Sequence, residues 1–176
     1  MEFIVDCMLG KLAKWLKILG FDAVFFSKIE DTELLTLAKK EKRILLTRDN
    51  GLIEKSCDIQ TLFIESEDWN HQIEQVLDEF KLWPVIRPYS RCIECNAELK
   101  DLPKHRARNL VTPFVYEKVD AFSICPSCGR VFWKGTHHQD MEVKIEEILS
   151  KRKKKKTSLH KKNQREKSKP QPFNSK

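Results

Sequence analysis

Short apolar stretches alternate with helical patterns along the first half of the chain, and this alternation constrains the fold more than any other feature. Strands are predicted at residues 2–6, 22–26, 43–47 and 60–65, and helices at residues 8–20, 31–42 and 70–81. Alternating strands and helices are typical of a parallel α/β layer structure. We therefore expect an α/β domain over residues 1–85, closed by two prolines near its end.

Three aspartates stand at one edge of this expected sheet. Asp6 ends the first strand, Asp31 opens the helix after the second, and Asp49 follows the third. Ligands of open α/β sheets bind beyond the carboxyl ends of the strands, so the three carboxylates are candidates for one site. Each also has a purely structural explanation, as a strand end, a helix N-cap and a turn residue respectively. Asp22 begins the second strand at the opposite edge and is left out of the site.

Clustered carboxylates repel one another unless a cation neutralises them, and hard oxygen ligands suit magnesium or manganese. Such ions activate water and stabilise the charge on a phosphodiester under attack. Asp6, Asp31 and Asp49 are therefore predicted to bind the metal and to be the catalytic residues of a nuclease. Accessory residues are predicted beside them: Glu30 and Glu33 as a further ligand or general base, and Lys11, Lys14 and Arg48 as contacts to RNA phosphates.

Four of the six cysteines form two C-x-x-C pairs. In a chain that is not exported, such pairs indicate a metal site rather than disulfides. The spacing C-x₂-C-x₂₉-C-x₂-C suits one tetrahedral zinc ion, and a site closed by four thiolates is structural. The predicted zinc ligands are Cys92, Cys95, Cys125 and Cys128. Asn96 and Gly129 follow the pairs, where a residue that tolerates positive φ lets the backbone turn. Cys7 and Cys57 stand alone and are interpreted as small buried residues.

The cysteine pairs lie in residues 89–141, among short apolar pieces such as residues 114–119, which predicts a small β-rich zinc ribbon. A basic loop is expected between the pairs. Its cations and two side chains after Trp133 are candidates for RNA contacts, with a solvated surface as the alternative. These candidates are Lys104, Arg106, Arg108, Lys134 and His137.

The net charge of +7 is distributed unevenly. Residues 151–176 hold 12 Lys/Arg and 1 Asp/Glu, whereas residues 1–150 hold 21 and 25. The basic tail lacks the apolar content that would offset its ordering entropy, so we expect it to be disordered and attracted to polyanions. No apolar run approaches the roughly 20 residues of a membrane helix. We expect a cytoplasmic protein without a membrane partner, or a nuclear one if the cell has a nucleus.

Several segments of the chain resemble a known family. They are DCMLGKLAKWLKILGFDAVFF, DTELLTLAKKEKRILLTRDNGL, RCIECNAEL and CPSCGRVFWKGTHHQDM, and together they cover residues 1–145. They resemble the Mut-seven-C RNase domain family, a branch of the PIN-like nucleases that ends in a zinc ribbon. The resemblance implies a PIN-like parallel sheet with helices on both faces, and a metal-dependent ribonuclease whose acids fall on Asp6, Asp31 and Asp49. Many PIN nucleases carry another acid on an intervening helix, which this chain lacks; one ion, or substitution by Glu30 or Glu33, would accommodate the difference.

Two functions of different classes remain open. The first is a ribonuclease that hydrolyses RNA, with tRNA, rRNA and ribosome-associated RNA as candidate partners. The second is a catalytically silent adaptor that binds RNA or the ribosome through the zinc ribbon and the basic tail. A phosphoaspartyl enzyme is disfavoured because Met8 stands where the D-x-D partner of Asp6 would be. A P-loop nucleotidase is disfavoured because the chain has no G-x-x-x-x-G-K-[ST] stretch.

Overall fold

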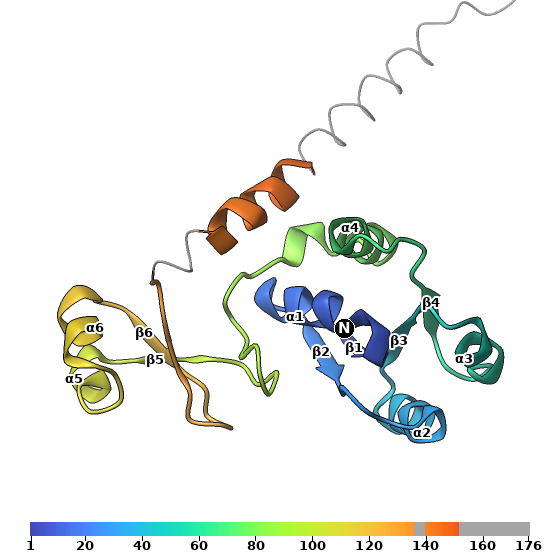
Figure 1. Cartoon of the computed structure of the whole chain (residues 1–176), viewed down its shortest axis with the longest axis horizontal. Coiled ribbons are helices and arrows are strands. Elements are labelled where there is room, and N and C mark those ends of the chain that lie inside the picture. Colours follow the sequence, from blue (N-terminus) through green and yellow to red (C-terminus); the bar gives the residue numbers. More distant parts are fainter. Residues whose placement is uncertain (136–139, 152–176) are drawn as a thin grey trace, which may run out of the picture.

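A computed structural model describes residues 1–135 and 140–151 of the chain (Figure 1). Its larger part is built on a parallel four-stranded sheet with the strand order β2-β1-β3-β4. The strands are β1 (Glu2–Val5), β2 (Asp22–Phe25), β3 (Ile44–Thr47) and β4 (Thr61–Phe63). Each lies within a strand range predicted from the sequence, and the predicted parallel α/β fold is confirmed.

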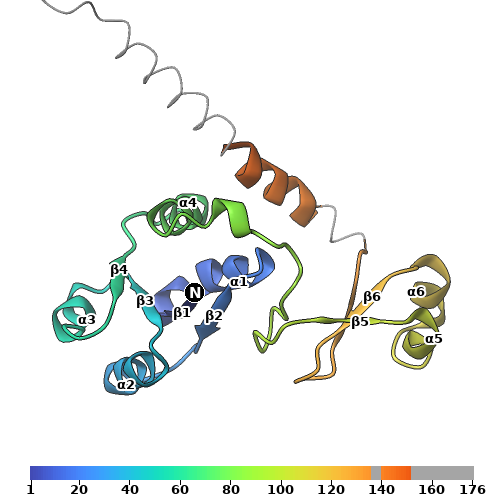
Figure 2. The same cartoon turned by 180° about the vertical axis from the view of Figure 1, so that it is seen from behind.

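Helices cover both faces of this sheet (Figures 1 and 2). One face carries α1 (Gly10–Ile18) and α4 (Trp69–Glu79), and the other carries α2 (Asp31–Glu41) and α3 (Asn50–Lys55). Residues of the central strands alternate between the two apolar layers because successive side chains of a strand point to opposite faces. Thus Phe3 and Val5 pack in the layer of α1, whereas Ile4 packs in the layer of α2.

The chain leaves the two central strands towards opposite faces of the sheet. After β1 it forms a 3₁₀ turn, η1 (Cys7–Leu9), and then α1; after the neighbouring β3 it forms α3 on the other face. Diverging connections open a crevice beyond the carboxyl ends of the strands, which is where open α/β sheets bind ligands. Asp6 follows β1 and Asp49 follows β3, so both lie at this switch point.

Two local predictions at the helix starts are corrected by the structure. Asp49 to Gly51 are interpreted above as a turn, but Asp49 is the N-cap of the short helix α3. Asp31 is predicted as the N-cap of its helix, but Glu30 holds that position and Asp31 is the first helical residue. Asp31 instead uses its carboxylate in an ion pair with Lys55, and this pair joins α2 to α3.

A second, antiparallel sheet of β5 (Lys100–Leu102), β6 (Phe122–Ile124) and β7 (Val131–Trp133) forms the ribbon. Two short helices, α5 (Lys104–Ala107) and α6 (Pro113–Lys118), lie between β5 and β6. The basic segment that includes Lys104, Arg106 and Arg108 was predicted as a loop, but it begins with the short helix α5. The apolar piece at residues 114–119, assigned above to a β-rich module, lies mostly in the helix α6. Thr112 caps α6 and Pro113 occupies its first turn, and these start signals outweigh the strand preference of the valines that follow.

The connection between the two sheets and the end of the described chain both pack against α1. The connection includes a 3₁₀ turn, η2 (Trp83–Val85), after which the backbone N–H of Tyr89 donates to the carbonyl of Ile18. Residues 140–151 form a helix that returns to the larger part (Figure 2), where Ile145 and Ile148 are buried with α1 and α4. Within the described ranges no helix has the length and apolar character needed to cross a membrane.

Candidate functional site

Asp6 is the buried carboxylate at the switch point. It lies directly after β1, its side chain is 6% exposed, and its backbone N–H donates to the carbonyl of Leu46 on β3. The hydroxyl of Thr47 donates to Asp6 Oδ2 over 2.7 Å. The neighbouring thiol of Cys7 has a raised pKa, first because it hydrogen-bonds to Asp6 and then because of burial. The strands thus hold a buried carboxylate at the carboxyl edge of the sheet.

Asp49 is linked to Asp6 through Thr47. The backbone N–H of Asp49 donates to the Thr47 hydroxyl over 3.0 Å, and the same hydroxyl donates to Asp6. Asp49 Oδ1 accepts the N–H groups of Gly51 and Leu52 at 2.7 and 3.4 Å, which caps α3. Since capping uses Oδ1 alone, Oδ2 makes no hydrogen bond within the described chain. Sequence reasoning missed Thr47, although a polar residue ending an apolar strand was a usable signal.

Asp31 lies with Lys55 rather than with the other two aspartates. Lys55 Nζ is 3.0 Å from Asp31 Oδ2, and both side chains are about half exposed, at 58% and 48%. The pKa of Lys55 is raised, first by this hydrogen bond and also by the charge of Asp49. Lys55 is therefore a cation placed between the two exposed acids of the edge. Glu30 and Glu33 flank Asp31 and are exposed, and their side chains make no ion pair or hydrogen bond among the described residues.

Side chains that could receive an anionic polymer surround this edge. Only part of the Arg48 guanidinium is paired. Its Nη2 lies 3.2 Å from exposed Glu67, while its buried Nε has no hydrogen-bond partner. Lys11 Nζ lies 4.9 Å from the ring centroid of Trp69, which stacks on Trp15 at 4.7 Å. Lys14 on the same helix is exposed. The sequence analysis did not identify Trp69, because the residues that it contacts, Trp15 and Lys11, lie more than fifty positions earlier in the chain.

The two isolated cysteines are not buried, contrary to the prediction. Cys7 lies in η1 beyond the end of β1, and Cys57 lies in the turn after α3; both are exposed. The sequence could not separate a turn cysteine from a core cysteine, because neither stands in a periodic apolar pattern. Neither belongs to the metal-binding group described next.

The four paired cysteines form a cluster that can hold a metal ion such as zinc. Their sulfur atoms all lie within 4.8 Å of one another, and within the described chain no other group of acids, histidines or cysteines meets that condition. The Sγ atoms of Cys92 and Cys128 are 3.7 Å apart, and those of Cys95 and Cys125 are 3.2 Å apart. Thiolates bound 2.3 Å from a tetrahedral zinc lie about 3.8 Å from one another. The donor set and its spacing therefore fit zinc after small adjustments.

The backbone around the cysteines turns as the sequence predicts. Asn96 and Gly129 have φ values of +68° and +73°, and their N–H groups donate to the carbonyls of Cys92 and Cys125. Burial raises the pKa of the Cys92 thiol to about 12, whereas a hydrogen bond from the backbone N–H of Ala97 is the main cause that lowers that of Cys95 to about 6. A bound cation would offset the burial of the thiolates.

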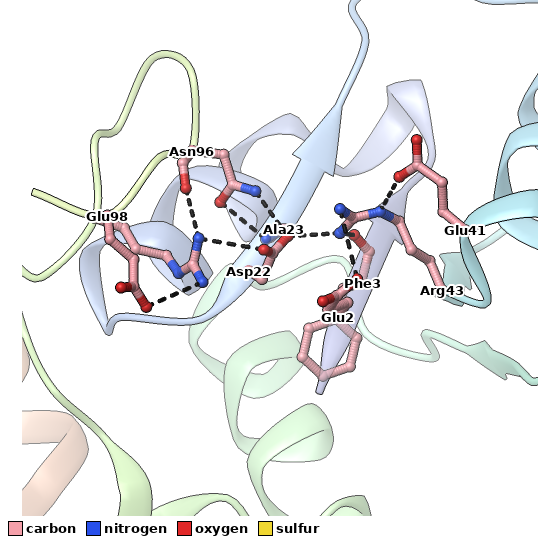
Figure 3. Close-up of polar contacts among 9 residues, drawn as sticks. Glu2, Phe3, Asp22, Ala23, Glu41, Arg43, Asn96 and Glu98 are labelled. Atoms are coloured by element: carbon pink, nitrogen blue, oxygen red, sulfur yellow. Dashed lines mark hydrogen bonds and ion pairs between the residues drawn. The ribbon is translucent and has the colours of Figure 1, made fainter. Parts of the chain in front are cut away.

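Polar and charged side chains connect the cysteine turns to the α/β part (Figure 3). Asn96 accepts the N–H of Ala23 on the edge strand β2 at 3.0 Å and donates to Asp22 at 2.8 Å. Asp22 also pairs with Arg43 at 2.5 Å and with Arg91 at 3.2 Å. The residue set aside in the sequence analysis is thus the centre of the contact between the two parts.

The candidate RNA contacts of the ribbon differ in their availability. Lys104 pairs with Asp120 at 2.7 Å, and Lys134 pairs with Glu142 at 3.3 Å. Arg106 and Arg108 are exposed and make no ion pair with any described residue. His137 and the basic tail beyond residue 151 lie outside the described residues.

The fold and the two sites define a doubly wound α/β domain with acids at its switch point, joined to a ribbon whose four clustered cysteines can hold a metal ion. A family model described as the Mut7-C RNAse domain matches residues 1–145, and the chain belongs to this family. The resemblance stated from the sequence is thereby confirmed, and the family name indicates nuclease chemistry on RNA. No match is found among curated proteins.

Proposed function

We propose that the protein is a metal-dependent ribonuclease whose reaction takes place at the switch point between β1 and β3. The observation that carries the proposal is the position of Asp6, a buried carboxylate at the carboxyl edge of the sheet, which the hydroxyl of Thr47 links to the backbone N–H of exposed Asp49. Burying a carboxylate costs free energy that a hydrogen bond, a cation or a catalytic use must offset, and buried acids of this kind gather at functional sites.

Asp6 and Asp49 would hold magnesium or manganese, with Asp31 as the third ligand and Glu30 or Glu33 as accessory acids. When bound, the ion would activate water and stabilise the charge that develops on the phosphate. Asp31 becomes available when its half-exposed side chain turns away from Lys55, which costs little because exposed ion pairs are weak. Asp49 contributes Oδ2 while Oδ1 keeps capping α3.

The RNA strand is positioned by cations around the crevice. Arg48 follows β3 beside Asp49, and its guanidinium can exchange exposed Glu67 for a phosphate. Lys11 and Lys14 lie on α1, one turn apart, and present a second pair of positive charges. Contacts of this type are independent of base sequence, so the substrate class is RNA without a specified sequence.

We propose roles for the four cysteines and for the three segments of the chain as well. Zinc at the four cysteines is structural, and residues 1–85, 89–141 and 151–176 are the nuclease domain, the ribbon and a basic tail. The contacts of Asp22 with Arg91 and Asn96, and the return of residues 140–151 to α1, support a ribbon fixed to the nuclease domain. We place the protein in the cytoplasm, with RNA as its partner.

The test is RNA cleavage by the full chain with manganese, compared with the Asp6→Asn and Asp49→Asn variants. Both should lose cleavage by at least a hundredfold, because each removes a charge that binds the ion. Asn retains the cap acceptor at position 49, so the loss would not come from unfolding of α3. Asp58→Asn is the matched control, since Asp58 forms an exposed pair with Lys39 away from the switch point.

Undiminished cleavage by both Asn variants would refute the proposed site. Absence of cleavage by the wild-type chain at millimolar manganese, together with salt-sensitive binding of RNA, would favour the adaptor function. Manganese binding followed by calorimetry separates a loss of metal from a loss of a later step.

A further inference from the structure

The insertion between β5 and β6 exposes a large aromatic ring among arginines. Phe114 on α6 is 71% exposed and Leu110, just before α6, is 53% exposed. The valines of the same segment, Val111 and Val115, pack against the core of the ribbon instead. A ring that stays in water forgoes the free energy that burial would supply, so a ligand that covers it would be stabilised.

The charge around this ring is strongly positive. Residues 103–119 hold four Lys/Arg and one Asp/Glu. Arg106 and Arg108 are exposed and have no ion-pair partner within the described chain, and Lys118 lies one helical turn from Phe114. Lys104 is held by Asp120 and by the ring of Tyr116, so it fixes the start of α5 rather than offering a free charge.

We infer that α5 and α6 form a second RNA-binding surface, on which Phe114 stacks with an unpaired base while Arg106 and Arg108 contact the flanking phosphates. An aromatic ring with neighbouring cations is the chemistry that single-stranded RNA requires, since every base has a flat face and every linkage a charge. A protein partner is less well matched, because two exposed apolar side chains fall short of the apolar centre of a stable interface.

This surface is separate from the acidic edge. In both views α5 and α6 lie at the end of the ribbon remote from the parallel sheet (Figures 1 and 2). The inference shares with the proposed ribonuclease only the assumption that RNA is the ligand, because it uses none of the acids of the switch point. Binding measured without cleavage therefore tests it by itself.

The experiment measures binding of the full chain to a single-stranded 2′-O-methyl oligouridylate by fluorescence anisotropy, without added divalent cation. Phe114→Ala should weaken binding by at least about fivefold, the lower end of what loss of one stacked base costs. Phe114→Tyr should bind like the wild type, whereas Phe114→Leu should resemble the alanine variant, because it keeps apolar area but loses the flat ring.

The double change Arg106→Ala with Arg108→Ala should lower the salt dependence of log K by about 1.4, or about 0.7 for each phosphate contact. The matched control is Lys28→Ala with Lys40→Ala, which removes two exposed charges from the α/β part and should leave the oligouridylate affinity unchanged at fixed salt. Circular dichroism and zinc content confirm folding of each variant.

A photo-cross-link from 5-iodouridine RNA to the peptide that holds Phe114 would support the surface directly. Wild-type affinity in Phe114→Ala, together with an unchanged salt dependence in the double arginine variant, would overturn the inference and leave the surface to a protein partner. Failure of cleavage by the Asp6→Asn variant with unchanged RNA binding would leave it intact.

Discussion

At the scale of single residues, Asp49 caps a helix with one carboxylate oxygen and leaves the other without a hydrogen bond within the described chain. Its Oδ1 accepts two backbone N–H groups at the start of α3, and N-caps of this kind contribute about 1 kcal/mol. Its Oδ2 faces no hydrogen-bond donor of the described chain. The turn that the sequence predicted is in fact a helix start, which fixes the backbone of Asp49 beside Thr47 and Asp6.

Lys55 is the residue whose removal should make the acidic edge a better cation site. Its ammonium forms an ion pair with Asp31 and is influenced by the charge of Asp49, so it would compete with a metal ion for both carboxylates. Lys55→Met should strengthen manganese binding several-fold in calorimetry, because the side chain length is kept and the charge is lost. Lys40→Met, an exposed lysine of α2, is the control. Equal manganese affinities in the two variants would contradict this account.

At the scale of elements, α1 contacts both the acidic edge of the sheet and the ribbon. Its N-terminal end follows Asp6, and at its other end Gly20 has φ of +93° and comes so near the connection that a Cβ there would lie 2.3 Å from the carbonyl of Arg87. Lys17, only 6% exposed, donates to the carbonyls of Ile93 and Glu94 at 3.2 and 3.3 Å. The helix therefore binds the first cysteine turn directly.

The ammonium of Lys17 would also offset the negative charge of a metal bound by four thiolates. Burial lowers the pKa of Lys17, and the charges of Cys92, Glu94 and Cys95 oppose that effect. Lys17→Met should weaken zinc binding by about 10- to 100-fold, because residues that interact with metal ligands typically contribute this much to metal affinity. Competition with a chelator measures the change. Lys14→Met on the exposed face of the same helix should leave the competition midpoint unchanged. A wild-type midpoint in the Lys17 variant would rule out this role.

At the scale of the whole molecule, Asp22 joins the edge of the parallel sheet to the ribbon. Burial alone would raise its pKa, but hydrogen bonds from Arg43 and Asn96, with the charges of Arg43 and Arg91, outweigh burial and leave the pKa below its usual value. Asp22→Asn removes the charge from this contact and should lower the free energy of unfolding by about 1–3 kcal/mol at neutral pH. Thermal or urea unfolding of the zinc-loaded chain provides the measurement.

The same group gives a dependence on pH with a defined sign. Because the pKa of Asp22 is lower in the folded state than the value of about 3.9 in an unfolded chain, its contribution is complete above that pH and is lost as the pH falls through the folded pKa. The difference between wild type and Asp22→Asn should therefore shrink below about pH 4. Asp58→Asn is the surface control, and a difference that does not depend on pH would contradict the assignment.

The sequence by itself determined the elements that depend on local pattern. The alternating apolar runs gave the parallel sheet, because side-chain period decides which faces can be buried. The cysteine spacing predicted the four-cysteine cluster that the structure shows, and Asn96 and Gly129 marked the turns that carry it. The helices α3 and α6 were not predicted. Asp49 and Thr112 accept N–H groups that have no partner within these helices, and whether such a residue caps a helix or forms a turn depends on the residues that follow.

Only the tertiary structure decided what lies side by side across long separations in the chain. Strand order put Asp6 next to Thr47, and helix packing put Lys55 on Asp31. The contact of Asp22 with the ribbon spans more than seventy residues, as the separation of 74 from Asn96 shows. No local sequence pattern encodes such pairs. They form only after burial of the apolar faces has fixed the helices and strands relative to one another, which brings polar side chains at their ends within hydrogen-bonding distance.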